Sequence, residues 1–264
     1  MRTLLVSGLL LAATLGSTSV ARAQSSSANT TSAEDVSYRK ELVYGVNFNT
    51  QGGLIGGAVF RSSKVLSRDW LRFWSIEGVE VKHPKEVKAP TNYGGTLVRE
   101  KTNYLFVLRP SIGAQRVIFR KAAESGVQVN ALGSAGPSIG LLMPYHVYYD
   151  YTQRDANGRP INGSTEDYRD EQYTSANQQP IVDRAPLFSG ASNIKPNIGA
   201  HLRGALSFEY GRYRDAVAGV EAGFLFEYFP TRLDILSSNL VPDDKLNKKF
   251  YPSVYLTVYI GHRS

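Results

Sequence analysis

Long stretches of this chain alternate apolar and polar residues with a period of two, and this pattern constrains the fold more than any other feature. In 216–229, every second side chain from Ala218 to Tyr228 is apolar, while the positions between them mix Gly and Glu. The segments 198–210 and 253–260 divide in the same way. Successive side chains of a β-strand point to opposite faces, whereas an α-helix repeats about every 3.6 residues. The pattern therefore predicts β-strands, each with one apolar face.

The same alternation along the rest of the chain predicts eight strands and no helix after Ala23, so the expected fold class is all-β. The strands are expected at 42–50, 53–66, 69–82, 102–120, 127–151, 197–213, 216–235 and 249–262.

The connections between these strands alternate in length, with the tight Gln51-Gly52 turn as the exception. In an antiparallel up-and-down meander, alternate connections emerge at opposite ends, so the long loops share one end. Transmembrane β-barrels have this asymmetry, an even strand count and apolar outward faces. The sequence therefore predicts an eight-stranded antiparallel up-and-down transmembrane β-barrel. The long polar connections are 83–101, 153–196 and 236–248, and the short ones are 67–68, 121–126 and 214–215.

The N-terminal segment has the pattern of a secretory signal peptide. A charged start at Arg2 precedes the apolar core LLVSGLLLAATLG, and Ala21-Arg22-Ala23 has the small-x-small form of a cleavage site. The core is shorter than the roughly 20 residues of a membrane-spanning helix, and no later apolar run reaches that length. The predicted domains are a signal peptide at 1–23, a polar Ser/Thr-rich linker at 24–41 and a β-barrel at 42–264.

Aromatic residues gather near the ends of the predicted strands rather than in their middles. Membrane barrels carry such rings at both interfaces with water, although Tyr and Trp are also good strand formers in soluble sheets. The pattern predicts two aromatic belts. They comprise Trp70 and Trp74 at the short-turn end, and Tyr145, Tyr148, Tyr149, Tyr228 and Tyr251 at the long-loop end.

A resemblance to a known family is carried by the signal peptide, the Gly-rich opening hairpin VYGVNFNTQGGLIGGAVF at 43–60, the GPSIG segment at 136–140 and the amphipathic closing strands. With these features the chain resembles the small outer-membrane β-barrel proteins of Gram-negative bacteria, often labelled porin-family barrels. The resemblance covers roughly residues 40–262. It implies a fold and a location rather than an activity: a barrel in the bacterial outer membrane, after export and cleavage near Ala23.

If the apolar faces meet lipid, the polar faces line the barrel interior and bring charges of both signs together there. An unpaired buried charge is costly, whereas a paired and hydrogen-bonded one can persist. Arg109 and Arg203 are therefore expected to bridge the carboxylates of Glu209 and Glu221. The expected interior polar network is Glu77, Arg109, Arg203, Glu209 and Glu221, with Glu80 as the alternative to Glu77 and Glu227 as a further candidate.

Candidate chemical motifs are weak. The chain has no Cys, which excludes disulfides and thiolate sites. The Gly-rich run at 52–57 lacks the Lys and Ser/Thr of a phosphate-binding loop, and the four His residues do not have metal-ligand spacing. The pair His262-x-Ser264 has no acidic residue after it to complete a triad. We therefore expect no catalytic residue, cofactor or metal.

The expected function is a non-enzymatic outer-membrane protein with a structural or surface-interaction role. Side chains fill an eight-stranded barrel, so little large-solute conductance is expected. The formal net charge is +7 but the basic residues are dispersed, which favours lipids and lipopolysaccharide over nucleic acid as acidic partners. The long loop 153–196 is the candidate contact for an extracellular partner.

Two other functions stay open. A soluble periplasmic lipocalin-like barrel would bind an apolar ligand inside, so its apolar faces would point inward and its polar faces outward. Alternation alone does not tell which of the two faces of a strand points inward. A lipid-modifying outer-membrane barrel enzyme would need a Ser, a His and a carboxylate brought together by the fold.

Overall fold

The computed structural model describes residues 38–91, 94–120, 126–161, 166–210 and 216–264. The predicted signal peptide at 1–23 and nearly all of the predicted linker lie outside these residues. Two short helices occur among them, the 3-10 helix η1 (Ala191–Asn193) and α1 (Asp243–Leu246). No helix in the described ranges has the length and apolar character needed to cross a membrane.

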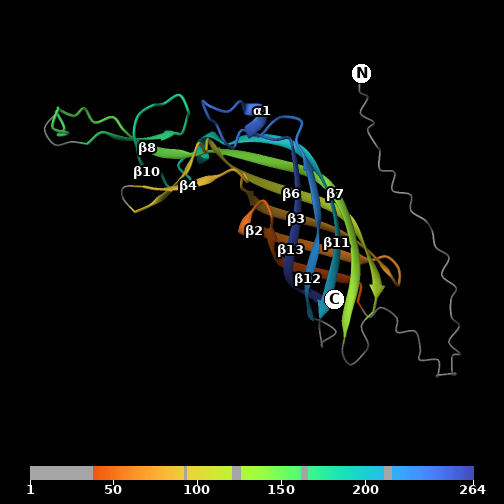
Figure 1. Cartoon of the computed structure of the whole chain (residues 1–264). Coiled ribbons are helices and arrows are strands. Elements are labelled where there is room, and N and C mark those ends of the chain that lie inside the picture. The colour runs from red at the N-terminus through yellow and green to blue at the C-terminus, as the bar shows by residue number, and fades with distance from the viewer. Residues whose placement is uncertain (1–37, 92–93, 121–125, 162–165, 211–215) are drawn as a thin grey trace, which may run out of the picture. The chain divides into compact units, whose positions relative to one another are not determined.

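Eight strands close into a barrel in the order β1-β13-β12-β11-β7-β6-β3-β2 (Figure 1). Every pair of neighbours is antiparallel, and β1 closes against β13 with Glu41 opposite Arg263 and Asn49 opposite Tyr255. The prediction of an all-β, eight-stranded, antiparallel up-and-down barrel is confirmed. The barrel strands are β1 (Lys40–Asn49), β2 (Gly53–Val65), β3 (Trp70–Val81), β6 (Asn103–Phe119), β7 (Val127–Pro144), β11 (Lys195–Tyr210), β12 (Ala216–Tyr228) and β13 (Phe250–Arg263).

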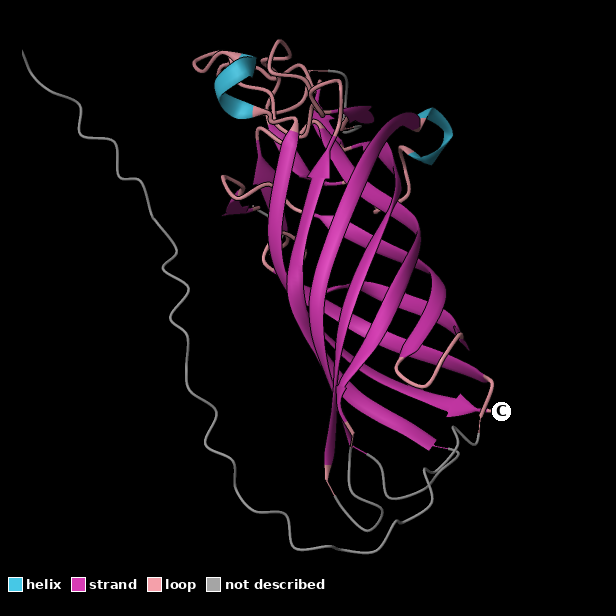
Figure 2. Ribbon diagram, turned by 90° about the vertical axis from the view of Figure 1, so that its right-hand side faces the viewer, coloured by secondary structure: helices cyan, strands magenta, loops and turns pink. Residues whose placement is uncertain are grey.

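The long connections lie at one end of the barrel and contain strands that the alternation did not reveal. Figure 2 shows the barrel strands winding at a tilt, with both helices at this end. The connection after β3 forms a hairpin, and the one after β7 forms a three-stranded sheet in the order β10-β8-β9. The additional strands are β4 (Val87–Pro90), β5 (Thr96–Arg99), β8 (His146–Asp150), β9 (Tyr168–Gln172) and β10 (Ile181–Arg184).

Two predicted strands were too long. The segment 127–151 is divided after Pro144, and β8 beyond it belongs to the separate sheet. The segment 216–235 leaves the barrel wall after Tyr228, where Pro230 follows. Proline has no backbone N–H to donate, so each of these prolines marks a place where the ladder of hydrogen bonds ends.

The barrel turns its polar side chains inward and its apolar side chains outward. Ile112 and Ile198 on the outer face are each 72% exposed, whereas Glu77 and Arg109 on the inner face are 2% and 4% exposed. Sequence alternation alone leaves open which face of each strand points inward, and here it is the polar face. This arrangement is the reverse of a lipocalin-like barrel, whose interior would be apolar.

Small residues on the inner face make room for large ones. Gly219 on β12 lies opposite Tyr259 on β13, and a Cβ atom at Gly219 would stand 2.5 Å from the Tyr259 hydroxyl and 2.6 Å from its ring. The Tyr259 hydroxyl also hydrogen-bonds the Ser207 hydroxyl at 2.5 Å. The ring therefore has little freedom to move aside.

We predict that Gly219→Val lowers the free energy of unfolding by about 1–3 kcal/mol, because overpacking displaces a ring that is fixed by a hydrogen bond. The matched control is Gly204→Val on the outer face, where a Cβ atom meets nothing within 4 Å. Urea unfolding in lipid vesicles, followed by the folded-form shift on gels, measures both. Equal stability of the two variants would contradict the packing described for Tyr259.

Candidate functional site

The inner faces of the strands bring five Glu and four Arg together inside the barrel, and each is at most 8% exposed. An isolated charge in such surroundings costs several kcal/mol, so the arrangement depends on pairing. The charges form three clusters along the barrel. The carboxylates are Glu41, Glu77, Glu209, Glu221 and Glu227, and the guanidiniums are Arg61, Arg109, Arg203 and Arg263.

The cluster nearest the long loops centres on Arg109. Its Nε and Nη2 donate to the two carboxylate oxygens of Glu227, each at 2.8 Å, and its Nη1 lies 3.5 Å from Glu77 Oε1. Glu77 also accepts a hydrogen bond from the Asn47 amide at 2.9 Å and forms an ion pair with Arg203. Two-pronged guanidinium–carboxylate pairs of this kind fix geometry as well as charge.

The middle cluster joins Arg61 to Glu221 at 2.6 Å. The Tyr255 hydroxyl donates to the other oxygen of Glu221, also at 2.6 Å. The Arg61 guanidinium lies over the rings of Phe73 and Tyr259, 5.6 Å and 5.4 Å from their centroids. Burial is thus offset by an ion pair, a hydrogen bond and ring contacts at once.

The cluster at the short-turn end is built on Arg263. Its Nη1 and Nη2 bind Glu209 at 2.8 Å and 2.5 Å, and its Nε donates to Glu41 at 2.8 Å. The same guanidinium lies 4.3 Å from the ring centroid of Tyr38. Because Arg263 and Glu41 face each other where β13 meets β1, this cluster also ties the barrel seam.

All five residues expected in the interior network are buried there, but the expected pairing is wrong. Arg109 and Arg203 pair with Glu227 and Glu77, while Glu209 pairs with Arg263 and Glu221 with Arg61. Alternation gives the face on which a residue lies but not its partner across the barrel, which depends on strand tilt and stagger. Glu41, Arg61 and Arg263 were not among the expected residues, although the alternation along their strands places them on the inner face.

A Ser, a His and a carboxylate do meet in the interior, at positions that the sequence did not suggest. The Ser138 hydroxyl donates to Glu227 Oε1 at 2.6 Å and lies 3.1 Å from His201 Nδ1. The carboxylate therefore holds the hydroxyl rather than the imidazole, unlike a triad in which the acid orients the histidine. All three side chains are buried, so the group extends the polar network. His262 and Ser264 are both exposed.

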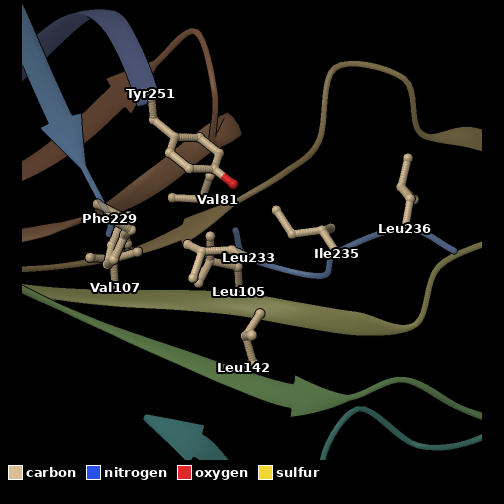
Figure 3. Packing of buried hydrophobic residues seen from close by; sticks show 10 residues of the cluster. Val81, Leu105, Val107, Leu142, Phe229, Leu233, Ile235, Leu236 and Tyr251 are labelled. Atoms are coloured by element: carbon tan, nitrogen blue, oxygen red, sulfur yellow. The ribbon is translucent and has the colours of Figure 1, made fainter. Parts of the chain in front are cut away.

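An apolar plug closes the long-loop mouth of the barrel above the charged interior. The segment after β12 turns inward, and Phe229, Leu233 and Ile235 are fully buried (Figure 3). Asn247 holds this segment, accepting from the backbone N–H groups of Ile235 and Leu236 at 3.0 Å and 3.2 Å. The complete cluster is Val79, Val81, Leu105, Val107, Leu142, Phe229, Leu233, Ile235, Leu236 and Tyr251.

Desolvation shifts the pKa values of two polar groups beside the plug. Burial lowers the pKa of His83, whose Nδ1 accepts the backbone N–H of Lys85 at 3.2 Å. Burial also raises the pKa of Asp234, helped by the charge of Asp243. Nearby, the buried Lys101 ammonium pairs with Glu86 at 2.8 Å. The loops at this mouth thus pack against the barrel and bury side chains there.

The aromatic belts are only partly as predicted. Trp70, Trp74 and Tyr228 are exposed on the outer face of barrel strands. The prediction for Tyr251 is wrong, because its side chain points inward and packs in the plug. Three others lie beyond the division of the chain at Pro144 rather than on the barrel wall: Tyr145 and Tyr149 are buried against Tyr104, Met143 and Val147, and Tyr148 is partly buried in β8.

One small cavity lies among the charged side chains of the interior. This cavity beside Arg61, Arg203 and Glu221 has a volume of about 10 Å³, which is room for about one water molecule. Its walls include Phe73 and Tyr259. At this level of the barrel, charged and aromatic side chains therefore occupy most of the interior.

Comparisons with known proteins give a likeness of fold. No protein-family model matches the sequence, and no curated protein matches it. Among solved structures, the attachment invasion locus protein Ail of Yersinia pestis, in complex with the heparin analogue sucrose octasulfate, is 8% identical with a TM-score of 0.36, covering 86% of this chain and 99% of Ail. Neisserial surface protein A is 9% identical with a TM-score of 0.37, covering 86% of this chain and 97% of that protein.

Ail in a phospholipid bilayer nanodisc gives similar values, with 11% identity, a TM-score of 0.37 and coverage of 86% and 99%. The class of the protein, a closed eight-stranded antiparallel β-barrel, is defined by its own strand pairing.

We predict that Arg109→Ala lowers the free energy of unfolding by about 3–5 kcal/mol, because it leaves the Glu227 carboxylate buried without its guanidinium partner. The double change Arg109→Met, Glu227→Gln should recover part of this loss. The control is Arg120→Ala, which removes the exposed pair with Asp69 and should cost at most about 1 kcal/mol. If Arg109→Ala and Arg120→Ala cost the same in urea titrations, the buried pairing is wrong.

We also predict that the reconstituted protein forms no steady, porin-sized channels in planar bilayers, because the charged core and the plug fill the barrel. Matched bilayers containing a large porin provide the positive control. Steady currents of porin size would show that the interior opens in a membrane.

Proposed function

We propose that this protein is an outer-membrane β-barrel of a Gram-negative bacterium with a structural or surface-interaction role and no enzymatic activity. The observation that carries the proposal is the closed barrel whose outer face is apolar over most of its length. Leu202, Phe224 and Ile260 are 58%, 59% and 66% exposed on three neighbouring strands. Soluble monomers rarely expose a contiguous apolar surface larger than a few hundred Å².

Backbone pairing supports the same location. In a bilayer every backbone polar group needs a partner, and a closed barrel supplies one without leaving an edge. The charged interior suits this placement and would not suit an apolar ligand. A lipocalin-like function is therefore not the one we propose.

Aromatic side chains near both ends of the outer face give further support. At the short-turn end Phe60 contacts Tyr44 and Trp74, with ring centroids 5.4 Å and 5.2 Å away. At the other end the rings of Phe226 and Phe250 are stacked at 6.2 Å. Rings at two levels match the two interfaces of a bilayer.

The long-loop end is the proposed outer surface and the site of contact with other molecules. Part of the loop 153–196 is folded, because its strands β9 and β10 pair with β8. Two ion pairs lie in or beside this sheet, Arg154 with Asp150 and Arg169 with Asp167. Exposed cations such as Lys88 and Lys249 at this end would face the phosphates of lipopolysaccharide. Export with cleavage near Ala23 is part of the proposal.

The test of location is fractionation of cells, followed by gel migration with and without heating. The protein should remain in the outer-membrane fraction until detergent is added, and the folded form should migrate differently from the heated form. A protein that stays soluble without detergent and shows no shift would overturn the proposed location.

Orientation gives a separate prediction. An epitope tag inserted between Asn157 and Gly158, in an exposed turn where Gly158 has a φ of +79°, should be tolerated and labelled on intact cells. The same tag between Ser67 and Arg68, in the short β2–β3 turn, should be labelled only after the outer membrane is opened. The reverse pattern would mean that the barrel is inserted the other way round.

A further inference from the structure

Outward-facing cations form a row across three neighbouring strands at the short-turn end of the barrel. Lys40 on β1 lies opposite Lys64 on β2, which lies opposite Arg72 on β3. All three side chains are exposed. Residues directly opposite on one face of a sheet have Cβ atoms about 4.5–5.5 Å apart, and like charges there are destabilising. Repulsion between the cations of the row therefore destabilises this part of the barrel.

A fourth cation extends the row onto β6. Arg116 lies opposite Trp70, with its guanidinium carbon 5.6 Å from the centroid of the Trp70 ring. Arg72 is opposite Ala114, so Arg116 is its diagonal neighbour on the same face. Cations thus occupy four adjacent strands, and one of them rests on an aromatic face.

Within the described part of the chain, Lys40, Lys64 and Arg72 have no acidic partner. The exposed acid of the neighbouring turn, Asp69, pairs with Arg120 at 2.9 Å. The repulsion along the row is therefore not balanced by carboxylates of the described residues. An anion from outside the chain would balance it.

The row lies at the level of the outward Trp rings. Trp70, Arg72 and Trp74 are successive outward residues of β3, about 7 Å apart. Toward the middle of the barrel the outward residues become apolar, as at Ile76 and Ile112. Because Trp rings in membrane proteins sit at the interface with water, the cations lie at the depth of lipid headgroups.

The opposite side of the same end carries no such row among the residues that the structure describes. The outward residues at the corresponding ends of β7, β11, β12 and β13 are Val127, Tyr210, Ala216 and His262. Among the residues that the structure describes, the outward cations of this row therefore lie on β1, β2, β3 and β6.

We propose that Lys40, Lys64, Arg72 and Arg116 form a binding site for the phosphates of anionic phospholipids in the periplasmic leaflet. The inference rests on the proposed membrane location, in which short turns face the periplasm. A guanidinium binds two phosphate oxygens at once, while an ammonium acts as a point charge. Bound phosphates would remove the cross-strand repulsion, so these lipids both occupy the site and stabilise the barrel.

The test compares the purified protein in phosphatidylcholine vesicles and in vesicles that contain a minority of phosphatidylglycerol. Selectivity is read from spin-labelled lipids of the two kinds, and stability from unfolding on gels. Wild type should prefer phosphatidylglycerol and be more stable in its presence. Lys64→Gln, Arg72→Gln should lose about fivefold or more of that preference, since each basic group near an anionic surface contributes on the order of 1 kcal/mol.

The matched control is Lys245→Gln, Lys248→Gln, which removes the same charge from exposed positions in the connection before β13 and should retain the preference. Equal selectivity of wild type and the Lys64, Arg72 variant would overturn the site. Equal stabilisation by soluble glycerol phosphate in neutral vesicles would also overturn it, by making the ligand a free phosphate.

The two proposals fail in different ways. A protein that inserts into neutral vesicles with a heat-modifiable shift but shows no lipid preference removes the lipid site and leaves the proposed location intact. A protein that inserts into neither vesicle overturns the membrane location, and the lipid site with it.

Discussion

Closure of β1 against β13 is the constraint on which the rest of the structure depends. Once the sheet closes, every strand has two neighbours and the alternation of side chains sends half of them into a narrow interior. Because this chain places its apolar half outside, its charged half has to be accommodated inside. The Arg263 contacts to Glu41 and Glu209 lie at the seam, so closure and charge pairing support each other there.

The interior achieves its stability by pairing rather than by hydrophobic packing alone. A buried ion pair of good geometry offsets its desolvation, and apolar residues of similar volume often do as well or better. The charges therefore cannot be explained by stability alone. They have a further physical effect, because a charged inner face and an apolar outer face allow each strand only one favourable choice of which face points inward. A strand shifted by one residue would expose Glu77 or Glu221 to the outer surface.

Much of the barrel could be predicted from the sequence because a period of two is a local property. The eight barrel strands were located by it, and the five interior residues were placed on the correct face. Partners across the barrel could not be predicted, because Arg109 meets Glu227 only through the tilt and stagger of strands far apart in the chain. The apolar residues Leu233 and Ile235 alternate like a strand, and only the break near Pro230 distinguishes the plug from the wall. The misplacement of Tyr145 and Tyr149 has the same cause at Pro144.

The plug also connects distant parts of the chain. Residues 229–236 belong to the connection between the last two strands, yet they pack on Val81, Leu105 and Leu142 from β3, β6 and β7. Contacts of such large sequence separation form slowly, since a long loop has to close before they contribute. The mouth can be sealed only after nearly all of the barrel is in place. We therefore expect sealing to come late in folding, and a barrel halted before its last hairpin to remain open at the long-loop mouth.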